Sequence, residues 1–200
     1  GFESSGSSSV SKGESIADTA KMFEGYSDAL VIRHELEGVT KFISDVVDVP
    51  VINAGDGAGQ HPTQTLLDLY TIKNEIGQID NLKIALIGDL KFGRTVHSLS
   101  YALGLFKNVK IYLISPPELK MPQEVLHDIE GTNVEYEEVD SIEEILDDVN
   151  VLYVTRIQKE RFADINDYLK IKGAYVLNKK LVEGKDLSIM HPLPRIDEID

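Results

Sequence analysis

The fold of this chain can be worked out from one stretch, which runs Val49-Pro50-Val51-Ile52-Asn53-Ala54-Gly55-Asp56-Gly57-Ala58-Gly59-Gln60-His61-Pro62-Thr63-Gln64. Its apolar start, residues 49–52, predicts a buried strand. Three glycines follow within five residues, so the backbone can turn tightly and approach a ligand closely. Pro62 then fits the first position of a helix, where its missing N–H is not needed. The stretch therefore predicts a strand, a glycine loop and a helix in direct succession.

Two polar side chains, His61 and Gln64, lie at the start of that helix, beside the positive end of the helix dipole. This arrangement suits a phosphate group or a developing oxyanion. An ordinary strand-to-helix turn with a capping histidine explains the same pattern. The stretch by itself leaves both interpretations open.

The composition limits the classes of function. The 200 residues, with 42% hydrophobic content, suffice for one large domain or two small ones with a real core. The net charge of −14 should repel nucleic acid, and no apolar run approaches the length of a membrane span. No signal peptide is visible and the chain has no cysteine, which fits a cytoplasmic protein. We therefore expect neither nucleic acid nor a membrane as a partner.

Strand and helix signals alternate along the rest of the chain. Strands are expected at residues 29–32, 49–52, 83–88, 109–114, 134–139, 149–155, 174–177 and 189–191. Such alternation predicts an α/β fold with parallel sheets covered by helices on both faces. We expect two doubly wound, Rossmann-like parallel-sheet domains, residues 1–76 and 77–200, joined by a linking helix over residues 62–76.

Local signals place some element boundaries. Ser11 and Glu14 have the spacing of a capping box, which predicts a helix that follows them. Ser141 is expected to cap another helix, whose apolar face includes residues 142–146. Charges at alternate positions of the strand at 134–139 place it near a sheet edge.

Basic residues are scarce in so acidic a chain, and several of them directly follow expected strands. In parallel sheets, ligands bind outside the carboxyl ends of the strands. The residues at those ends are Arg33, His61, Arg94, Arg156 and the turn Pro192-Leu193-Pro194. Salt bridges to nearby glutamates are the alternative for Arg33 and Arg156. No Cys/His cluster and no His-Glu-x-x-His motif indicates a metal site.

Five motifs, in order along nearly the whole chain, resemble those of aspartate transcarbamoylase catalytic chains. The string from Asn53 to Thr71 is similar to the family's carbamoyl phosphate motif. The other four are Val31-Ile32-Arg33-His34, the segment from Gly88 to Ser98, the segment from Thr155 to Arg161, and the segment from His191 to Ile199. The ornithine branch looks different, since it carries His-Cys-Leu-Pro where this chain has His191-Pro192-Leu193-Pro194.

The resemblance implies a reaction. It implies condensation of carbamoyl phosphate with L-aspartate to N-carbamoyl-L-aspartate and phosphate, a step of pyrimidine biosynthesis. By resemblance, Arg33 and His61 donate to the carbamoyl carbonyl oxygen, and Gln64 binds the carbamoyl amide. Backbone carbonyls of the turn that contains Leu193 and Pro194 hold the amide and the incoming amine.

The resemblance assigns the remaining site residues as well. Arg94, Arg156 and Gln158 match a clamp on the two aspartate carboxylates, a task suited to bidentate guanidinium groups. Ser8 and Lys12 match a loop that a neighbouring subunit inserts into the site, so a homotrimer with shared sites is implied, with regulatory chains as possible further partners. No metal and no organic cofactor is implied.

The resemblance also implies a gap. The family's Ser-Thr-Arg-Thr-Arg phosphate-binding segment and its final helix are absent from this sequence. We therefore expect the first domain to be incomplete and the 200-residue chain alone to be inactive. A transcarbamoylase with a different amino-acid acceptor and a non-catalytic truncated relative are the alternative functions.

Overall fold

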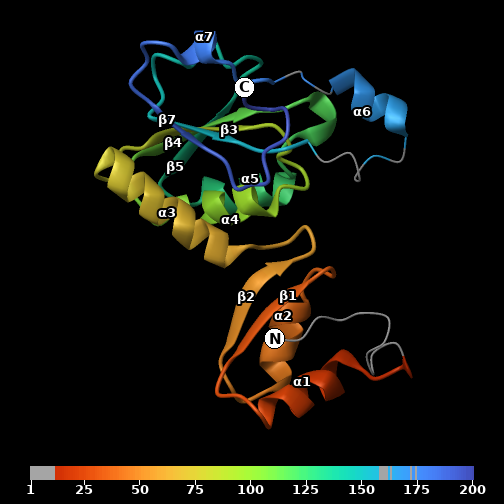
Figure 1. The fold of residues 1–200 in the computed structure, drawn as a ribbon. Helices are drawn as coiled ribbons and strands as arrows, with labels where there is room; N and C mark the ends of the chain where they lie inside the picture. Colours follow the sequence, from red (N-terminus) through yellow and green to blue (C-terminus); the bar gives the residue numbers. More distant parts are fainter. Residues whose placement is uncertain (1–11, 158–161, 163, 172, 174) are drawn as a thin grey trace. The chain divides into compact units, whose positions relative to one another are not determined.

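A computed structural model describes residues 12–157, 162, 164–171, 173 and 175–200 (Figure 1). The chain divides into two compact units, Gly1–Thr63 and Gln64–Asp200, so their boundary falls in the first turn of helix α3 (Pro62–Ile76). The sequence places the domain boundary at residue 76 instead, and that functional assignment remains a prediction.

Unit 1 contains two helices and a two-stranded parallel sheet. The helices are α1 (Ile16–Glu24) and α2 (Val39–Val46), and the strands are β1 (Leu30–His34) and β2 (Val51–Asp56). Its core consists of Ala20, Val39, Ile43 and Val47, with partly buried strand residues packed against them. Ser11 of the predicted capping box lies outside the described residues, and the residue that caps α1 is Ser15, whose hydroxyl accepts the Asp18 N–H at 3.1 Å.

Strand β2 is longer than the sequence predicts. It continues through Gly55 to Asp56, because β1 offers hydrogen-bonding partners along this length, with Leu30 opposite Val51 and His34 opposite Asp56. The glycine-rich loop is correspondingly shorter and ends at His61. The parallel pairing brings the carboxyl ends of β1 and β2 to the same edge of the sheet.

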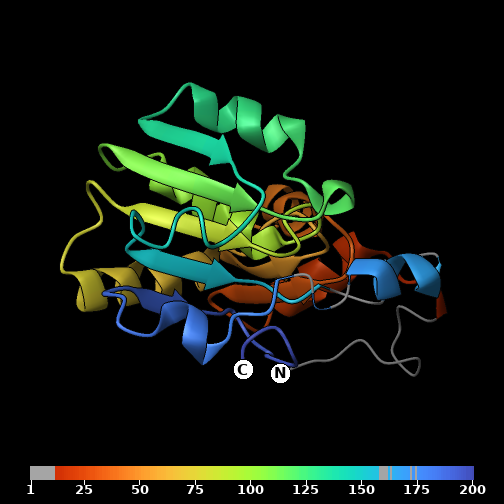
Figure 2. The same ribbon diagram turned by 90° about the horizontal axis from the view of Figure 1, so that it is seen from above.

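Unit 2 is built on a five-stranded parallel sheet in the order β5-β4-β3-β6-β7, which Figure 2 shows with its strands side by side. The strands are β3 (Lys83–Ile87), β4 (Val109–Ile114), β5 (Val134–Glu138), β6 (Val151–Val154) and β7 (Ser188–Met190). This is a doubly wound order, because the chain starts in the middle of the sheet and moves first to one edge and then to the other. The predicted α/β class and the edge position of β5 are confirmed.

Each face of this sheet has its own core. On one face lie α3, α4 (Arg94–Leu103) and α5 (Gln123–Glu130), which contribute Ile72, Leu99 and Leu126 (Figure 1). The other face is covered by residues 142–149, by Leu177 and by the short helix α7 (Lys179–Val182). The short helices η2 (Pro117–Leu119) and α6 (Ile165–Ile171) complete the described elements.

Two sequence predictions in unit 2 are wrong. Residues 142–148 form successive turns rather than a helix, and the Ser141 hydroxyl donates to the Glu144 carboxylate instead of capping backbone N–H groups. Tertiary packing of the three apolar side chains in this segment does not require a helix, because turns bury them equally well. Of the strand expected at 174–177, residue 174 lies outside the described residues, and the rest forms only an isolated bridge between Leu177 and Ile199. None of the helices in the described ranges has the length and apolar character needed to cross a bilayer.

Candidate functional site

A buried carboxylate organises the ligand edge of unit 1. Asp56 is only 5% exposed, and its Oδ1 accepts the Gln60 N–H at 2.9 Å while its Oδ2 accepts the Gly38 N–H at 3.0 Å. The backbone of Gly57 donates to the His34 carbonyl at 3.0 Å. These bonds tie the loop after β2 to the end of β1. They fix the point at which the chain enters α3, and the sequence offered no signal for this role of Asp56.

Two of the candidate site residues of unit 1, Arg33 and His61, lie at this edge. Arg33 is an exposed residue near the end of β1, and His61 is half-buried, directly before α3. The Nδ1 atom of His61 lies 3.3 Å from the Thr63 hydroxyl. Both side chains are thus placed at the carboxyl ends of two adjacent parallel strands, as the sequence predicts.

In unit 2, the strand order reverses between β3 and β6, and the loops after these two strands interlock. The Thr155 hydroxyl donates to the Ile87 carbonyl at 2.9 Å and accepts the Asp89 N–H at 2.9 Å. Gly88 has a φ of 109°, and a Cβ atom there would lie 2.4 Å from the Thr155 carbonyl oxygen. Only glycine allows this approach. The close contact between these two loops therefore gives a rigid backbone, to which Arg94 and Arg156 are attached.

Arg94 is positioned by a tightly held loop. The Asp89 carboxylate is fully buried and accepts the Phe92 N–H at 2.9 Å. Gly93 then caps α4, and Arg94 is the first residue of that helix, half-buried. A guanidinium group at a helix N-terminus opposes the helix dipole, so a bound anion there would be favourable.

Arg156 lies beside a third loop, which follows β7. The strands β6 and β7 are paired, with Tyr153 opposite Met190. Burial of the imidazole is the main reason that the pKa of His191 is lowered. The Glu198 carboxylate opposes this shift, and the positive charges of Arg195 and Arg156 add to it. Arg156 therefore lies within electrostatic range of the His191 loop.

The loop after β7 is held in an unusual conformation. Leu193 has a φ of 59°, a region that residues with side chains seldom adopt, and it precedes a cis peptide bond to Pro194. The His191 Nδ1 atom accepts the Leu193 N–H at 2.8 Å, and its Nε2 atom lies 2.6 Å from Glu198 Oε1. The Glu198 carboxylate also accepts the N–H groups of Ile196 and Asp197. These contacts present the exposed Leu193 and its backbone at the sheet edge.

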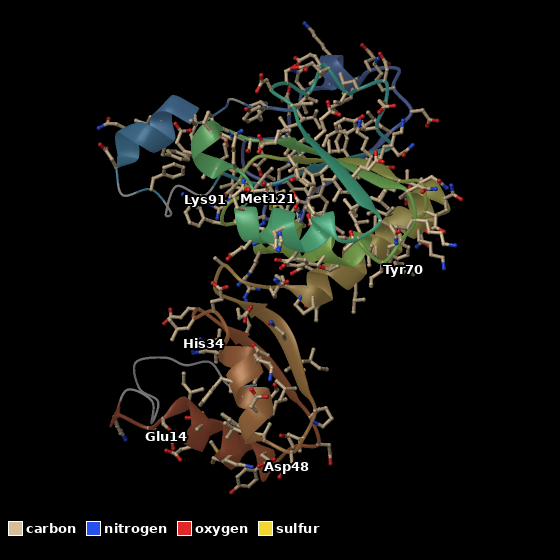
Figure 3. All side chains as sticks on the ribbon, turned by 180° about the vertical axis from the view of Figure 1, so that it is seen from behind. Glu14, His34, Asp48, Tyr70, Lys91 and Met121 are labelled. Carbon is tan, nitrogen blue, oxygen red and sulfur yellow. The ribbon has the colours of Figure 1, made fainter. Side chains whose placement is uncertain are left out.

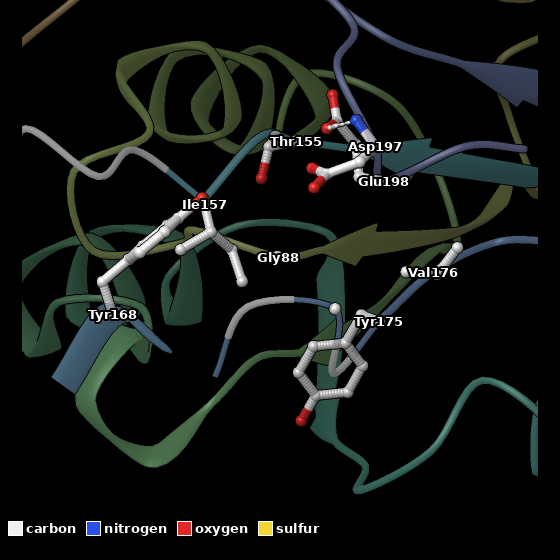
Figure 4. Close-up of a pocket in the computed structure, with 9 residues that line it drawn as sticks. Gly88, Thr155, Ile157, Tyr168, Tyr175, Val176, Asp197 and Glu198 are labelled. Carbon is white, nitrogen blue, oxygen red and sulfur yellow. Dashed lines mark hydrogen bonds between the residues drawn. The ribbon is translucent and has the colours of Figure 1, made fainter. Parts of the chain in front are cut away.

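A small pocket lies under these loops (Figure 4). Gly88, Thr155, Tyr175 and Glu198 are among its lining residues. Its volume of about 20 Å³ holds about one water molecule. A cavity of this size is too small for a ligand larger than water.

Gln64 is held by a buried network. Its Nε2 atom donates to Asp68 Oδ1 at 3.0 Å, and the Tyr153 hydroxyl donates to Asp68 Oδ2 at 2.8 Å. Burial raises the pKa of Asp68 to about 6, and the two hydrogen bonds oppose that rise. The four-residue spacing of Gln64 and Asp68 on a helix could have indicated this pair from the sequence. The contact with Tyr153 could not be foreseen.

The predicted site residues thus fall into separate groups. The structure places Arg33 and His61 at the edge of unit 1, and Arg94, Arg156, Leu193 and Pro194 at the edge of unit 2. Lys12 is exposed, before α1. Ser8 and Gln158 lie outside the described residues. Within the part of the chain that the structure describes, no three His, Asp or Glu side chains gather as metal ligands.

Two family models match the chain. The carbamoyl-P binding domain of aspartate/ornithine carbamoyltransferase matches residues 2–74. The Asp/Orn binding domain of aspartate/ornithine carbamoyltransferase matches residues 80–200. Together they cover nearly the whole sequence.

Individual relatives agree with the family models. The aspartate carbamoyltransferase catalytic subunit of Methanobrevibacter smithii is 79% identical over 199 residues, which are 100% of this chain and 63% of that protein. The solved catalytic subunit of M. jannaschii aspartate transcarbamoylase has 58% identity and a TM-score of 0.87, over 97% of this chain and 63% of that one. A Trypanosoma cruzi aspartate transcarbamoylase solved with carbamoyl phosphate and aspartate has 40% identity and a TM-score of 0.89, over 100% of this chain and 66% of that one. The chain therefore spans about two thirds of the length of these relatives.

Proposed function

Because this chain belongs to the aspartate/ornithine carbamoyltransferase family, we propose that the protein carrying it transfers the carbamoyl group of carbamoyl phosphate to the amino group of L-aspartate. The products are N-carbamoyl-L-aspartate and phosphate, in pyrimidine biosynthesis. The first domain, residues 1–76, binds carbamoyl phosphate, and the second, residues 77–200, binds aspartate. The ranges matched by the two family models support this division.

One observation supports the choice of L-aspartate as the carbamoyl acceptor. Arg94 and Arg156 follow β3 and β6, the two central strands between which the strand order reverses. Ligands of doubly wound sheets bind at this position. Two guanidinium groups on a rigid backbone suit a carbamoyl acceptor with two carboxylates, since each guanidinium group can bind one carboxylate in bidentate fashion. Gln158 completes this clamp.

The carbamoyl group is activated by hydrogen bonds rather than by a covalent intermediate. When the aspartate amine attacks the carbonyl carbon, negative charge develops on the carbonyl oxygen, and Arg33 and His61 donate to that oxygen. Gln64 binds the carbamoyl amide. Phosphate leaves with the electrons of the broken C–O bond and accepts the proton lost by the amine. Neither a metal nor an organic cofactor takes part in this scheme.

The loop after β7 orients the attacking amine. The left-handed Leu193 and the following Pro194 lie in the loop after β7, the strand that pairs with β6, and we assign their backbone carbonyls to the two reacting groups. Carbonyl oxygens accept hydrogen bonds from an amine and from an amide, so the loop suits both reacting groups. Holding the two substrates in this geometry supplies most of the rate enhancement.

The subunit assembly is also part of the proposal. We assign a homotrimer in which Ser8 and Lys12 reach the site of the neighbouring subunit, and a cytoplasmic location. The exposed position of Lys12 is compatible with this role. Association with regulatory chains is a further part of the proposal.

The decisive experiment is an acceptor panel with the full-length polypeptide that carries this chain. With carbamoyl phosphate as the donor, L-aspartate should give carbamoylated product, while ornithine and asparagine should give at least tenfold lower kcat/KM. Equal or faster reaction with ornithine would overturn the dicarboxylate clamp. Absence of product with every acceptor would overturn the enzyme assignment.

A further inference from the structure

Helix α3 places a carboxylate on its inward face. Asp68 is 4% exposed and lies on the same side as the fully buried Ile72. On the outward side, Leu66 and Tyr70 are 68% exposed, and Figure 3 shows Tyr70 projecting away from the helix. An apolar residue would be the stabilising choice at position 68, because a buried carboxylate loses its hydration. The charged form of Asp68 is therefore unfavourable for stability at this position.

The bonds of Asp68 connect several parts of the site. It joins Gln64 on its own helix to Tyr153 on β6, and the Thr95 side chain on α4 also hydrogen-bonds to Tyr153. Strand β6 leads to Arg156, and α4 begins at Arg94. Among the described residues, both groups that hydrogen-bond to Asp68 are neutral, so the burial of its charge is not offset by an ion pair there.

We propose that Asp68 is a positioning residue that fixes the orientation of the Gln64 carboxamide and thereby sets the specificity for a carbamoyl donor. An ionised carboxylate only accepts hydrogen bonds, so the Gln64 amide nitrogen must face it. The Gln64 carbonyl oxygen is then turned to the opposite side of the carboxamide. This oxygen is a hydrogen-bond acceptor, so it selects a carbamoyl-donor substrate that presents an N–H group to it. This inference rests on the proposed function and deepens it.

The substitution Asp68→Asn tests the orientation directly. Asparagine has nearly the same shape, but its NH₂ group can donate to Gln64. With Tyr153 bonded to the asparagine oxygen, Gln64 can flip and present its own NH₂ group to the substrate. In the variant, Gln64 therefore presents a hydrogen-bond donor instead of a hydrogen-bond acceptor to the carbamoyl amide, and no side chain is removed.

The assay compares two donors in the full-length protein with L-aspartate as the acceptor. Carbamoyl phosphate carries the amide, and acetyl phosphate has a methyl group in its place. Asp68→Asn should lower kcat/KM for carbamoyl phosphate about ten- to hundredfold, the effect of losing one hydrogen bond and facing an unpaired donor. The value for acetyl phosphate should change less than about threefold, because a methyl group does not hydrogen-bond to either orientation.

Three variants separate positioning from a general effect on the fold. Asp128→Asn makes the same chemical change in another helical aspartate that hydrogen-bonds to a tyrosine, Tyr101, and should leave the donor preference unchanged. In a Gln64→Ala background, Asp68→Asn should have no further effect on the preference, since the residue through which it acts is gone. Tyr153→Phe should lower the preference in the same direction as Asp68→Asn but by a smaller factor.

The outcomes are distinct. Equal losses with both donors, or an undiminished effect of Asp68→Asn in the Gln64→Ala background, would overturn the positioning role while leaving the proposed function intact. An active wild-type protein with an unchanged donor preference in Asp68→Asn would do the same. A wild-type protein that carbamoylates no acceptor would overturn the proposed function and this inference together.

Discussion

The buried Asp68 should make the stability of unit 2 fall as the pH rises from about 4 to about 6. Its pKa is raised from 3.8 to about 6 by burial, so between these values the folded state binds more protons than the unfolded state. Each unit of pKa is worth 1.36 kcal/mol, so the ionised carboxylate costs about 3 kcal/mol above pH 6 and nothing below about pH 4. Asp68→Asn removes this cost because asparagine stays neutral.

The measurement is denaturant unfolding of the 200-residue chain at pH 4.5 and 7.5, followed by circular dichroism. Relative to wild type, Asp68→Asn should gain about 2 kcal/mol more at pH 7.5 than at pH 4.5, because part of the cost is already present at pH 4.5. Asp148→Asn is a control of opposite sign, because hydrogen bonds from Lys83 and Tyr112 hold the pKa of Asp148 below its usual value. It should therefore lose stability at pH 7.5. A gain for Asp68→Asn that is the same at both pH values would refute the reasoning.

Other substitutions test the remaining site geometry. Gly88→Ala should destabilise unit 2 by about 2–4 kcal/mol in denaturant unfolding, whereas Gly184→Ala, also at positive φ but with no atom near its Cβ position, should cost only about 1 kcal/mol; similar costs would contradict the close approach. Arg156→Ala in the full-length protein should raise KM for aspartate and reduce kcat/KM at least tenfold, and unchanged kinetics would argue against the clamp. In NMR titrations, the pKa of His191 should lie below 6.5 and fall further in Glu198→Gln, since that carboxylate opposes the shift; a rise would show that the pairing is wrong.

Much of the fold was determined by local patterns. The bounds of α3 and β4 agree with the sequence prediction, because a proline at the first helical position and an uninterrupted apolar run are signals that neighbouring residues suffice to create. The parallel α/β class followed from the alternation of strands and helices. The positions of Arg94 and Arg156 after buried strands also followed, since the carboxyl ends of parallel strands share one edge.

Local patterns misplaced those elements whose boundaries depend on distant partners. Pairing with β1 extends β2 to Asp56, and packing against the sheet allows turns over residues 142–148 where a helix was expected. The spacing at Ser11 resembled a capping box, but Ser15, four residues later, supplies the hydroxyl that caps α1. In each case a second segment, or a competing cap nearby, decided the outcome.

Residues 49–64 show the same difference between what local sequence and what tertiary packing determine. By itself, the sequence determined a strand, a glycine loop and a helix that begins at Pro62 with His61 and Gln64 beside it. Only the tertiary structure decided how Gln64 is oriented, because its carboxamide is fixed through Asp68 by Tyr153, which lies 85 residues further along the chain than Asp68. Hydrogen bonds between buried groups so far apart form only when the sheet and helix pack together, so no local pattern can encode them.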